Sequence, residues 1–260
     1  MFTETTTGMR WTPEQAKIIN MSFDLSDPRV TKVMAFAGSG KTSTLVELCR
    51  KNPTRQFLVI VFNKAIKLQW ADLKLGNVKA YTAHSLAWNY WHDRGITKEQ
   101  LGVDMKIDEH IDTSNVQDGR KWKKFKAQVK ATVESFCHSI ETSISIEHTP
   151  EKWPDSSSVT EMEWMEAFLT MGLPQPPREN CMKDVPHEER IQIFLEAQRL
   201  WKEIERMRRK DIVWGCSIYL KMFQLQKPDL LDIPACQSTE VLLIDEAQDL
   251  NPAMLDSKYG

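Results

Sequence analysis

The stretch Ala35-Phe-Ala-Gly38-Ser-Gly40-Lys41-Thr42 decides the fold, because its residue types suit a loop that binds phosphate. It follows the apolar, β-branched run 30–36, which predicts a strand, and it leads into residues 43–49, which predict a helix. Gly38 and Gly40 permit backbone conformations that a Cβ would obstruct, so that successive N–H groups can point at one anion. The helix behind them adds unpaired N–H donors and the positive end of its dipole.

Two side chains at the end of this loop suit a nucleotide bound with Mg²⁺. Lys41 supplies a positive charge for the β- and γ-phosphates, and Thr42 supplies a hydroxyl for Mg²⁺. The sequence departs from the usual pattern at Ala35, because the pattern has a glycine at this position, five residues before Gly40. A glycine turn that by chance precedes a helix and a lysine stays open as the alternative.

A second motif, near the other end of the chain, places two carboxylates directly after an apolar run. Residues 241–244 suit a buried parallel strand, and Asp245 and Glu246 follow it. In a hydrolase with such a phosphate loop, the first acid holds Mg²⁺ beside Thr42, and the second can deprotonate the attacking water. A solvated acidic helix start is the alternative. Together, the two motifs predict nucleotide hydrolysis.

Alternating strands and helices predict an α/β fold. The apolar run 56–62 precedes a predicted helix over 65–73, and the short run 78–81 precedes a further helix. Such alternation is typical of a parallel sheet, in which ligands gather at the carboxyl ends of the strands. The polar motifs of this sequence all follow predicted strands, so we expect them to share one edge of the sheet.

The order of these motifs resembles superfamily 1 DNA helicases of the UvrD/Rep type, and most closely their F-box DNA helicase branch. The resemblance rests on Thr12-Pro-Glu-Gln15, the phosphate loop, Val61-Phe-Asn-Lys-Ala65, Tyr81-Thr-Ala-His-Ser85 and Asp245-Glu-Ala-Gln-Asp249. It frames residues 12–249, although the region between 95 and 238 contributes nothing to it. The resemblance implies a RecA-like P-loop NTPase fold with a large helical insertion. Residues 1–94 plus 239–260 would form the first, incomplete RecA-like domain, and residues 95–238 the inserted helical subdomain.

The resemblance also implies roles for particular residues, with ATP and Mg²⁺ as cofactors. Gln15 would read the adenine edge through its side-chain amide, which both donates and accepts hydrogen bonds. The implied nucleotide contacts are Gln15, Ala37, Gly38, Ser39, Gly40, Lys41, Thr42 and Ser43, the implied Mg²⁺ ligands are Thr42 and Asp245, and the implied catalytic residues are Lys41, Asp245, Glu246 and Gln248.

Five residues are implied as contacts to single-stranded DNA: Phe62, Asn63, Lys64, Thr82 and His84. An aromatic ring can stack on a base, while a lysine and hydroxyls can bind phosphates. The alternatives are that Phe62 is a core residue of a strand, that Lys64 is a surface lysine at a helix start, and that His84 is structural.

Residues 95–238 are predicted to be mostly helical. Gly119–Lys130 interleaves lysines with apolar residues at helical spacing, which indicates either the wet side of a core-facing helix or a DNA-backbone patch. Arg190–Lys210 repeats this pattern. Trp153–Ser158 and Leu173–Pro177 are predicted loops.

Composition excludes several classes of protein. The net charge of −2 over 260 residues carries no global basic signature, so nucleic-acid binding must rest on local patches. The five scattered cysteines form no Cys-x-x-Cys pair, which favours a reducing compartment over disulfides or zinc.

The sequence lacks a transmembrane-length apolar run and a signal peptide, so we expect an intracellular protein without a membrane partner. The resemblance implies the nucleus and DNA repair.

The chain ends eleven residues after Asp249, before any Gly-Asp-x-x-Gln motif or second RecA-like domain. We therefore expect an N-terminal fragment that binds Mg-ATP weakly and neither hydrolyses it rapidly nor unwinds DNA alone. Its expected partners are ATP, single-stranded DNA, and either the missing motor domain or a recombination or repair protein. A truncated ATP- and DNA-binding module without turnover is the second hypothesis. A nucleotide kinase is the third, and the motifs around Lys64 and Asp245 argue against it.

Overall fold

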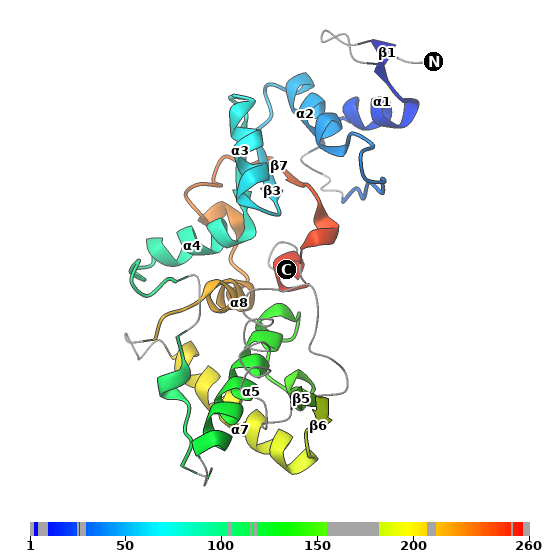
Figure 1. The fold of residues 1–260 in the computed structure, drawn as a ribbon. Coiled ribbons are helices and arrows are strands. Elements are labelled where there is room, and N and C mark those ends of the chain that lie inside the picture. Colours follow the sequence, from blue (N-terminus) through cyan, green and yellow to red (C-terminus); the bar gives the residue numbers. More distant parts are fainter. Residues whose placement is uncertain are drawn as a thin grey trace. The chain divides into compact units, whose positions relative to one another are not determined.

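The computed structural model describes residues 3–4, 10–24, 26, 30–102, 106–114, 116, 119–154, 182–206, 212–250 and 252–256. The chain folds into two compact units, Met1–Leu86 with Asp229–Leu250, and Ala87–Pro228 with Asn251–Gly260 (Figure 1). The domains expected from the sequence divide the chain at other residues and stay a prediction. Most of helix α4 (Ala83–Asp93) belongs to the second unit, because Tyr90 packs on Phe223 and Trp91 on Trp214.

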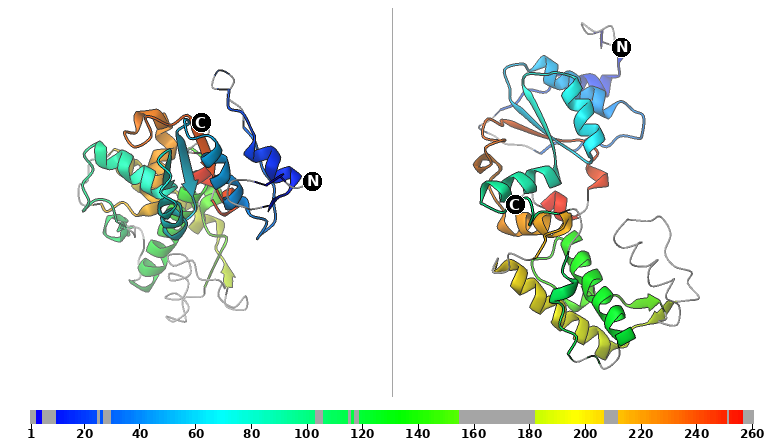
Figure 2. Two further views of the ribbon diagram at one scale, coloured as in Figure 1. Left: turned by 90° about the horizontal axis from the view of Figure 1, so that it is seen from above. Right: turned by 60° about the vertical axis from the view of Figure 1, so that its left-hand side comes forward.

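The first unit is built on a parallel sheet with the strand order β4-β3-β7. Its strands are β3 (Phe57–Val61), β4 (Val78–Thr82) and β7 (Val241–Ile244), and Phe57 pairs with both Val78 and Val241. All of β3 is buried, since it is the central strand. Figure 2 shows the helices beside these strands. The predicted α/β class and parallel sheet are thus confirmed, whereas the RecA-like fold stays a prediction.

The predicted strand over residues 30–36 is wrong. No strand forms there, and the side chains of Met34 and Phe36 are 96% and 91% exposed. An apolar, β-branched run becomes a strand only when a neighbouring strand takes up its backbone hydrogen bonds. In the described part of the chain, β3 lies between β4 and β7, and residues 30–36 pair with neither edge of this sheet.

Two of the helices in this unit begin at residues whose side chains cap them. The helices are α1 (Pro13–Ile19), α2 (Lys41–Lys51) and α3 (Lys64–Asp72). The short antiparallel strands β1 (Thr3–Glu4) and β2 (Arg10–Trp11) precede α1. The unit also contains the 3₁₀ turns η4 (Leu230–Asp232) and η5 (Ala247–Asp249). Thr12 and Gln15 form a capping box at the start of α1. Asn63 caps α3, because its side-chain oxygen accepts from the backbone N–H of Ile66 at 3.0 Å.

The core of this unit lies between the sheet and helices α2 and α3. It is formed by apolar side chains from the four elements α2, β3, α3 and β7, which are Val46, Cys49, Phe57, Val59, Val61, Trp70 and Val241. Burial of these side chains fixes the starts of α2 and α3 at the carboxyl ends of the strands.

The side chain of Asn77 is expected to stabilise this unit. Its Nδ2 atom lies 3.0 Å from the carbonyl oxygens of Cys49 and Asn52 and 3.2 Å from that of Arg55. Asn77→Ala leaves these carbonyls at the end of α2 without that donor, so we expect the free energy of unfolding to fall by about 1–3 kcal/mol. Urea denaturation measures this loss, and a change within about 0.5 kcal/mol, as for an ordinary surface substitution, would contradict it.

The second unit is mostly helical. It contains α5 (Gly119–His138), α7 (His187–Glu205), α8 (Cys216–Gln226) and α9 (Pro252–Asp256), the 3₁₀ turns η1 (Asp108–His110) and η2 (Ile146–His148), and the antiparallel strands β5 (Lys152–Pro154) and β6 (Met182–Asp184). Helices α5 and α7 form within the ranges predicted to be helical. On α5, Phe125 and Val129 are buried while Lys121 and Lys123 are exposed, which favours the interpretation of α5 as a core-facing helix with a charged outer side. Lys124 forms an ion pair of 2.9 Å with Glu189 on α7.

Parts of the sequence-based account lie outside the described residues. These are the predicted loop at 173–177, residues 155–158 of the other predicted loop, Cys181, and the part of the range 190–210 beyond Arg206. The loop prediction for Trp153 and Pro154 is wrong, because both residues lie in β5. The other four cysteines are free thiols. Among the helices that the structure describes, none is both long and apolar enough to cross a membrane.

Candidate nucleotide-binding site

The phosphate-loop motif forms a glycine turn at the start of α2. Gly38 and Gly40 have φ values of +74° and +80°, in the left-handed region that favours glycine. A Cβ on Gly40 would lie 3.1 Å from Nε2 of Gln15. Gly40 is the N-cap of α2 and provides no side-chain cap, so the first N–H groups of the helix stay available to an anion.

Thr42 and Asp245 meet although 203 residues separate them. The hydroxyl of Thr42, in the first turn of α2, donates to Oδ2 of Asp245 at 2.9 Å. Asp245 directly follows β7, its side chain is buried, and its backbone N–H donates to the carbonyl oxygen of Ile60 at 2.9 Å. The pairing of β7 with β3 therefore sets the position of the carboxylate beside the phosphate loop.

Lys41 and Glu246 form a second contact between the two motifs, with 3.4 Å between Nζ and Oε1. The side chain of Gln248 donates to Oε2 of Glu246. This hydrogen bond, and the neighbouring charge of Lys41, hold the pKa of the Glu246 carboxyl below its usual value. Glu246 is therefore ionised at neutral pH, and a bound phosphate would compete with it for Lys41.

Glu246 also has an unusual backbone conformation, with a φ of +56°. A residue other than glycine in this region carries strain, which persists only where the surrounding structure imposes it. Here the strained residue lies between the end of β7 and the turn η5, and its side chain reaches Lys41. The strain thus falls on the predicted proton acceptor.

Gln15 holds the phosphate loop from the side of α1. Its Nε2 atom donates to the carbonyl oxygen of Ser39 at 3.1 Å and to the hydroxyl of Thr44 at 3.2 Å. Its Oε1 atom accepts from the backbone N–H of Thr12 at 3.0 Å. The predicted contact of Gln15 with adenine stays a prediction, while its role in fixing the loop was not foreseen from the sequence.

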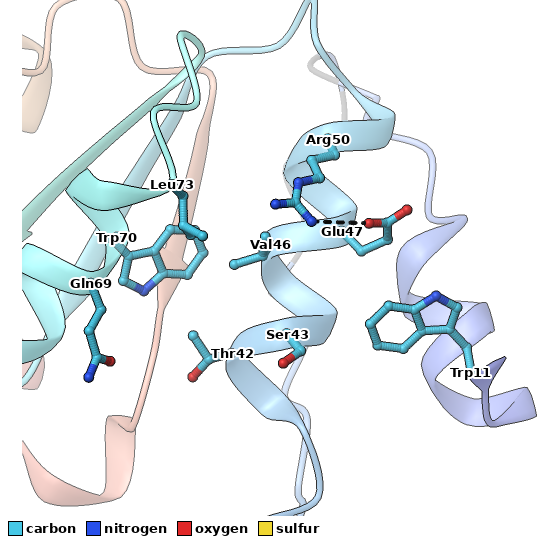
Figure 3. Close-up of a pocket in the computed structure, with 9 residues that line it drawn as sticks. All are labelled: Trp11, Thr42, Ser43, Val46, Glu47, Arg50, Gln69, Trp70 and Leu73. Atoms are coloured by element: carbon cyan, nitrogen blue, oxygen red, sulfur yellow. Dashed lines mark ion pairs between the residues drawn. The ribbon is translucent and has the colours of Figure 1, made fainter. Parts of the chain in front are cut away.

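A cavity of about 280 Å³ adjoins this site along α2 (Figure 3). Its lining residues are Trp11, Thr42, Ser43, Val46, Glu47, Arg50, Gln69, Trp70 and Leu73. Figure 3 shows Trp70 and Leu73 on one side of α2 and Trp11 on the other. Of these, only Thr42 and Ser43 were predicted to be site residues, because the others belong to no nucleotide motif.

The buried side chain of Trp70 was also missed by sequence reasoning. Its indole N–H donates to Oδ2 of Asp245 at 3.4 Å. Its position on α3, seven residues after Asn63, could suggest a core residue but gave no signal of contact with Asp245.

The residues predicted to contact DNA lie at the carboxyl ends of two neighbouring strands. Val61 pairs with Thr82, so the motifs that follow β3 and β4 are adjacent. Phe62 lies outside β3 with its side chain 41% exposed, which makes its interpretation as a core residue wrong. Lys64 is exposed at the start of α3, and His84 is half-buried in the first turn of α4. DNA contact by these residues stays a prediction.

Comparison with known proteins supports a helicase relationship. The chain is 29% identical over 255 residues to F-box DNA helicase 1 of Gallus gallus, and 24% identical over 268 residues to F-box DNA helicase protein 1 of Schizosaccharomyces pombe. Each similarity covers 95% of this chain, which spans 22% and 26% of the lengths of these relatives. The chain matches no family model and no solved structure. The assignment to the UvrD/Rep type and the status of a fragment stay predictions.

Proposed function

We propose that this chain is the ATP-binding part of a DNA helicase motor that couples ATP hydrolysis to movement along single-stranded DNA. The hydrogen bond of 2.9 Å between Thr42 and Asp245 carries the proposal, because it joins the two nucleotide motifs at one edge of the sheet. The similarity to proteins named DNA helicases supports the choice of DNA over other substrates.

The residues of the site fit Mg-ATP. The hydroxyl of Thr42 and the carboxylate of Asp245 are oxygen ligands of the kind that Mg²⁺ prefers. Gly38 and Gly40 hold the loop backbone in left-handed conformations, and the N-terminus of α2 supplies N–H donors. When bound, Mg-ATP supplies the phosphoryl group that is transferred to water.

The side chains of the chain have separate roles in this proposal. Lys41 binds the phosphates, and Thr42 with Asp245 holds the metal ion. Glu246 takes a proton from the attacking water at one of its carboxylate oxygens, while Gln248 fixes the orientation of that carboxylate. The Lys41–Glu246 ion pair must open for Lys41 to reach phosphate, so nucleotide binding and the release of Glu246 are coupled.

Single-stranded DNA is proposed to bind at the ends of β3 and β4. Because a stacked base contributes about 1–3 kcal/mol, we expect Phe62→Ala to weaken binding of an oligothymidylate by roughly 5–150-fold without changing its salt dependence. Lys64→Ala removes one phosphate contact, so the slope of log K against log salt should fall by about 0.7. Fluorescence anisotropy over a series of salt concentrations measures both effects.

Two control variants accompany this DNA-binding test. Leu68→Ala is the control for Phe62→Ala, because it removes an apolar side chain that is 54% exposed on α3. Lys51→Ala is the control for Lys64→Ala, because it removes a lysine at the C-terminal end of α2. If the two test variants bind the oligonucleotide no differently from these controls, this surface is not the DNA site. A location in the nucleus and a partner in recombination or repair remain predictions.

The proposed function is tested by ATP hydrolysis of the 260-residue chain with and without oligothymidylate. We expect slow hydrolysis that depends on Mg²⁺ and rises with DNA. Mg-ATP binding without any hydrolysis would instead favour the second hypothesis, an ATP- and DNA-binding module. Absence of both would contradict the proposal.

A further inference from the structure

The indole of Trp70 is a polar group inside an apolar core. Trp70 packs in the cluster that includes Val46 and Val241, and its side chain is 2% exposed. Its only polar atom, Nε1, donates to Oδ2 of Asp245. A buried N–H group needs a hydrogen-bond partner. The carboxylate of Asp245 is that partner, and it explains why a residue with a polar atom is tolerated at this position of the core.

The carboxylate of Asp245 is held by donors from two different helices. Its Oδ2 atom accepts from Thr42 on α2 at 2.9 Å and from Trp70 on α3 at 3.4 Å. Because these donors approach the same oxygen from separate elements, they fix the rotation of the carboxylate as well as its position. Groups that orient a metal ligand in this way tune the affinity for the metal.

Helix α3 carries Trp70 and begins at two of the proposed DNA contacts, Asn63 and Lys64. Its N-cap is Asn63 and its first residue is Lys64, whereas Trp70 lies about two turns further along. Over that distance a helix moves as a rigid element. A shift of its exposed start on contact with DNA would therefore be transmitted to the hydrogen bond between Trp70 and Asp245.

We propose that Trp70 is a positioning residue, which orients Asp245 for Mg²⁺ and links the DNA-facing end of α3 to the affinity for Mg-ATP. This proposal rests on the proposed function. No motif of the sequence assigns Trp70 a role, and its effect is exerted through Asp245 rather than by contact with ATP.

The test compares two variants that each remove a buried indole N–H. Trp70→Phe removes the donor to Asp245. Trp91→Phe is the matched control, because Trp91 is also 2% exposed and donates to the carbonyl oxygen of Tyr219 at 2.8 Å, within the helical unit. Both variants lose a buried hydrogen bond and an indole, so they are matched for the structural cost.

The measurement is the Mg²⁺ concentration that gives half-maximal binding of a fluorescent ATP analogue to the 260-residue chain. We expect Trp70→Phe to raise it by about 10–100-fold, the range found when a partner of a metal ligand is removed. Trp91→Phe should leave it unchanged. Oligothymidylate should shift the value for the wild type and for Trp91→Phe, and this shift should be lost in Trp70→Phe.

Three outcomes would overturn the proposal or its basis. An unchanged Mg²⁺ requirement in a folded Trp70→Phe variant shows that Trp70 only packs the core. If oligothymidylate still shifts the Mg²⁺ requirement of Trp70→Phe, then α3 does not link DNA to the affinity for Mg-ATP through Trp70. Wild-type chain that binds no nucleotide at any Mg²⁺ concentration refutes the proposed function itself, and with it this inference.

Two further measurements keep the test decisive. If Trp70→Phe does not fold, 3-benzothienylalanine at position 70 retains the bicyclic shape and replaces the N–H with sulfur, and it should raise the Mg²⁺ requirement equally.

In the Asp245→Asn background, Trp70→Phe should cause no additional change, because the two residues act as one unit. An additive effect would contradict the assignment.

Discussion

Glu246→Gln is expected to lower the rate of ATP hydrolysis by about 10²–10⁴-fold, the usual contribution of a general base. The amide cannot accept the proton of the attacking water, although it has the same shape. The substitution also removes the ion pair with Lys41, so that Lys41 is free to bind phosphate. ATP should therefore bind as tightly as in the wild type, or more tightly. Radiolabelled ATP measures the rate, and equilibrium titration measures the affinity.

The control for this prediction is Glu240→Gln, which removes the same charge next to the other end of β7. Glu240 pairs with Arg55 at 2.9 Å and lies away from the phosphate loop. Its substitution should leave the hydrolysis rate within a factor of about two, the effect of an ordinary surface change. A measurable wild-type rate that survives in Glu246→Gln would show that another group takes the proton.

Lys41→Ala is expected to weaken binding of Mg-ATP by roughly 10–100-fold, as befits the loss of hydrogen bonds from a charged donor. The lost side chain carries the positive charge that the phosphate loop holds beside Glu246. Without it, the carboxylate of Glu246 faces the phosphates uncompensated, which opposes binding further. Calorimetric titration with ATP measures the effect.

Lys51→Ala serves as the control here, because it removes a lysine from the opposite end of the same helix. Its Nζ atom donates to the side chain of Asn20 at 2.8 Å on the surface. ATP affinity should be unchanged in this variant. Equal affinities for the wild type and Lys41→Ala would place the nucleotide elsewhere or exclude it.

The sequence predicted the meeting of the two nucleotide motifs, because each followed an apolar run that implied the same edge of a parallel sheet. Glycines with positive φ, a hydroxyl and two carboxylates carry their chemistry in their residue types, so Gly40, Thr42 and Asp245 were identifiable. The Thr-x-x-Gln spacing of the capping box at Thr12 is likewise visible in the sequence.

The segment 30–36 could not be predicted correctly from composition. Its residues have high strand propensity, yet strand formation depends on a partner that lies elsewhere in the chain. The sequence left Phe62 open between an exposed contact and a core residue, because the apolar run 56–62 does not reveal that β3 ends at Val61.

Trp70 shows a second limit of prediction. Its spacing along α3 indicates burial, but its hydrogen bond to Asp245 depends on the tertiary fold, which brings together residues 175 positions apart in the sequence. Contacts of Gln15 with Ser39 and Thr44 arise in the same way, since one side chain serves a local cap and a distant loop. Such positioning roles lie in tertiary packing rather than in any motif.

The measurement that tests the account most directly is calorimetric titration of the 260-residue chain with ATP, in Mg²⁺ and in a chelator, for the wild type and Lys41→Ala. The account predicts a single site that needs both Mg²⁺ and Lys41, since Thr42, Asp245 and the phosphate loop act together. Binding that is absent in the wild type, or that is equal with and without Lys41, would contradict it.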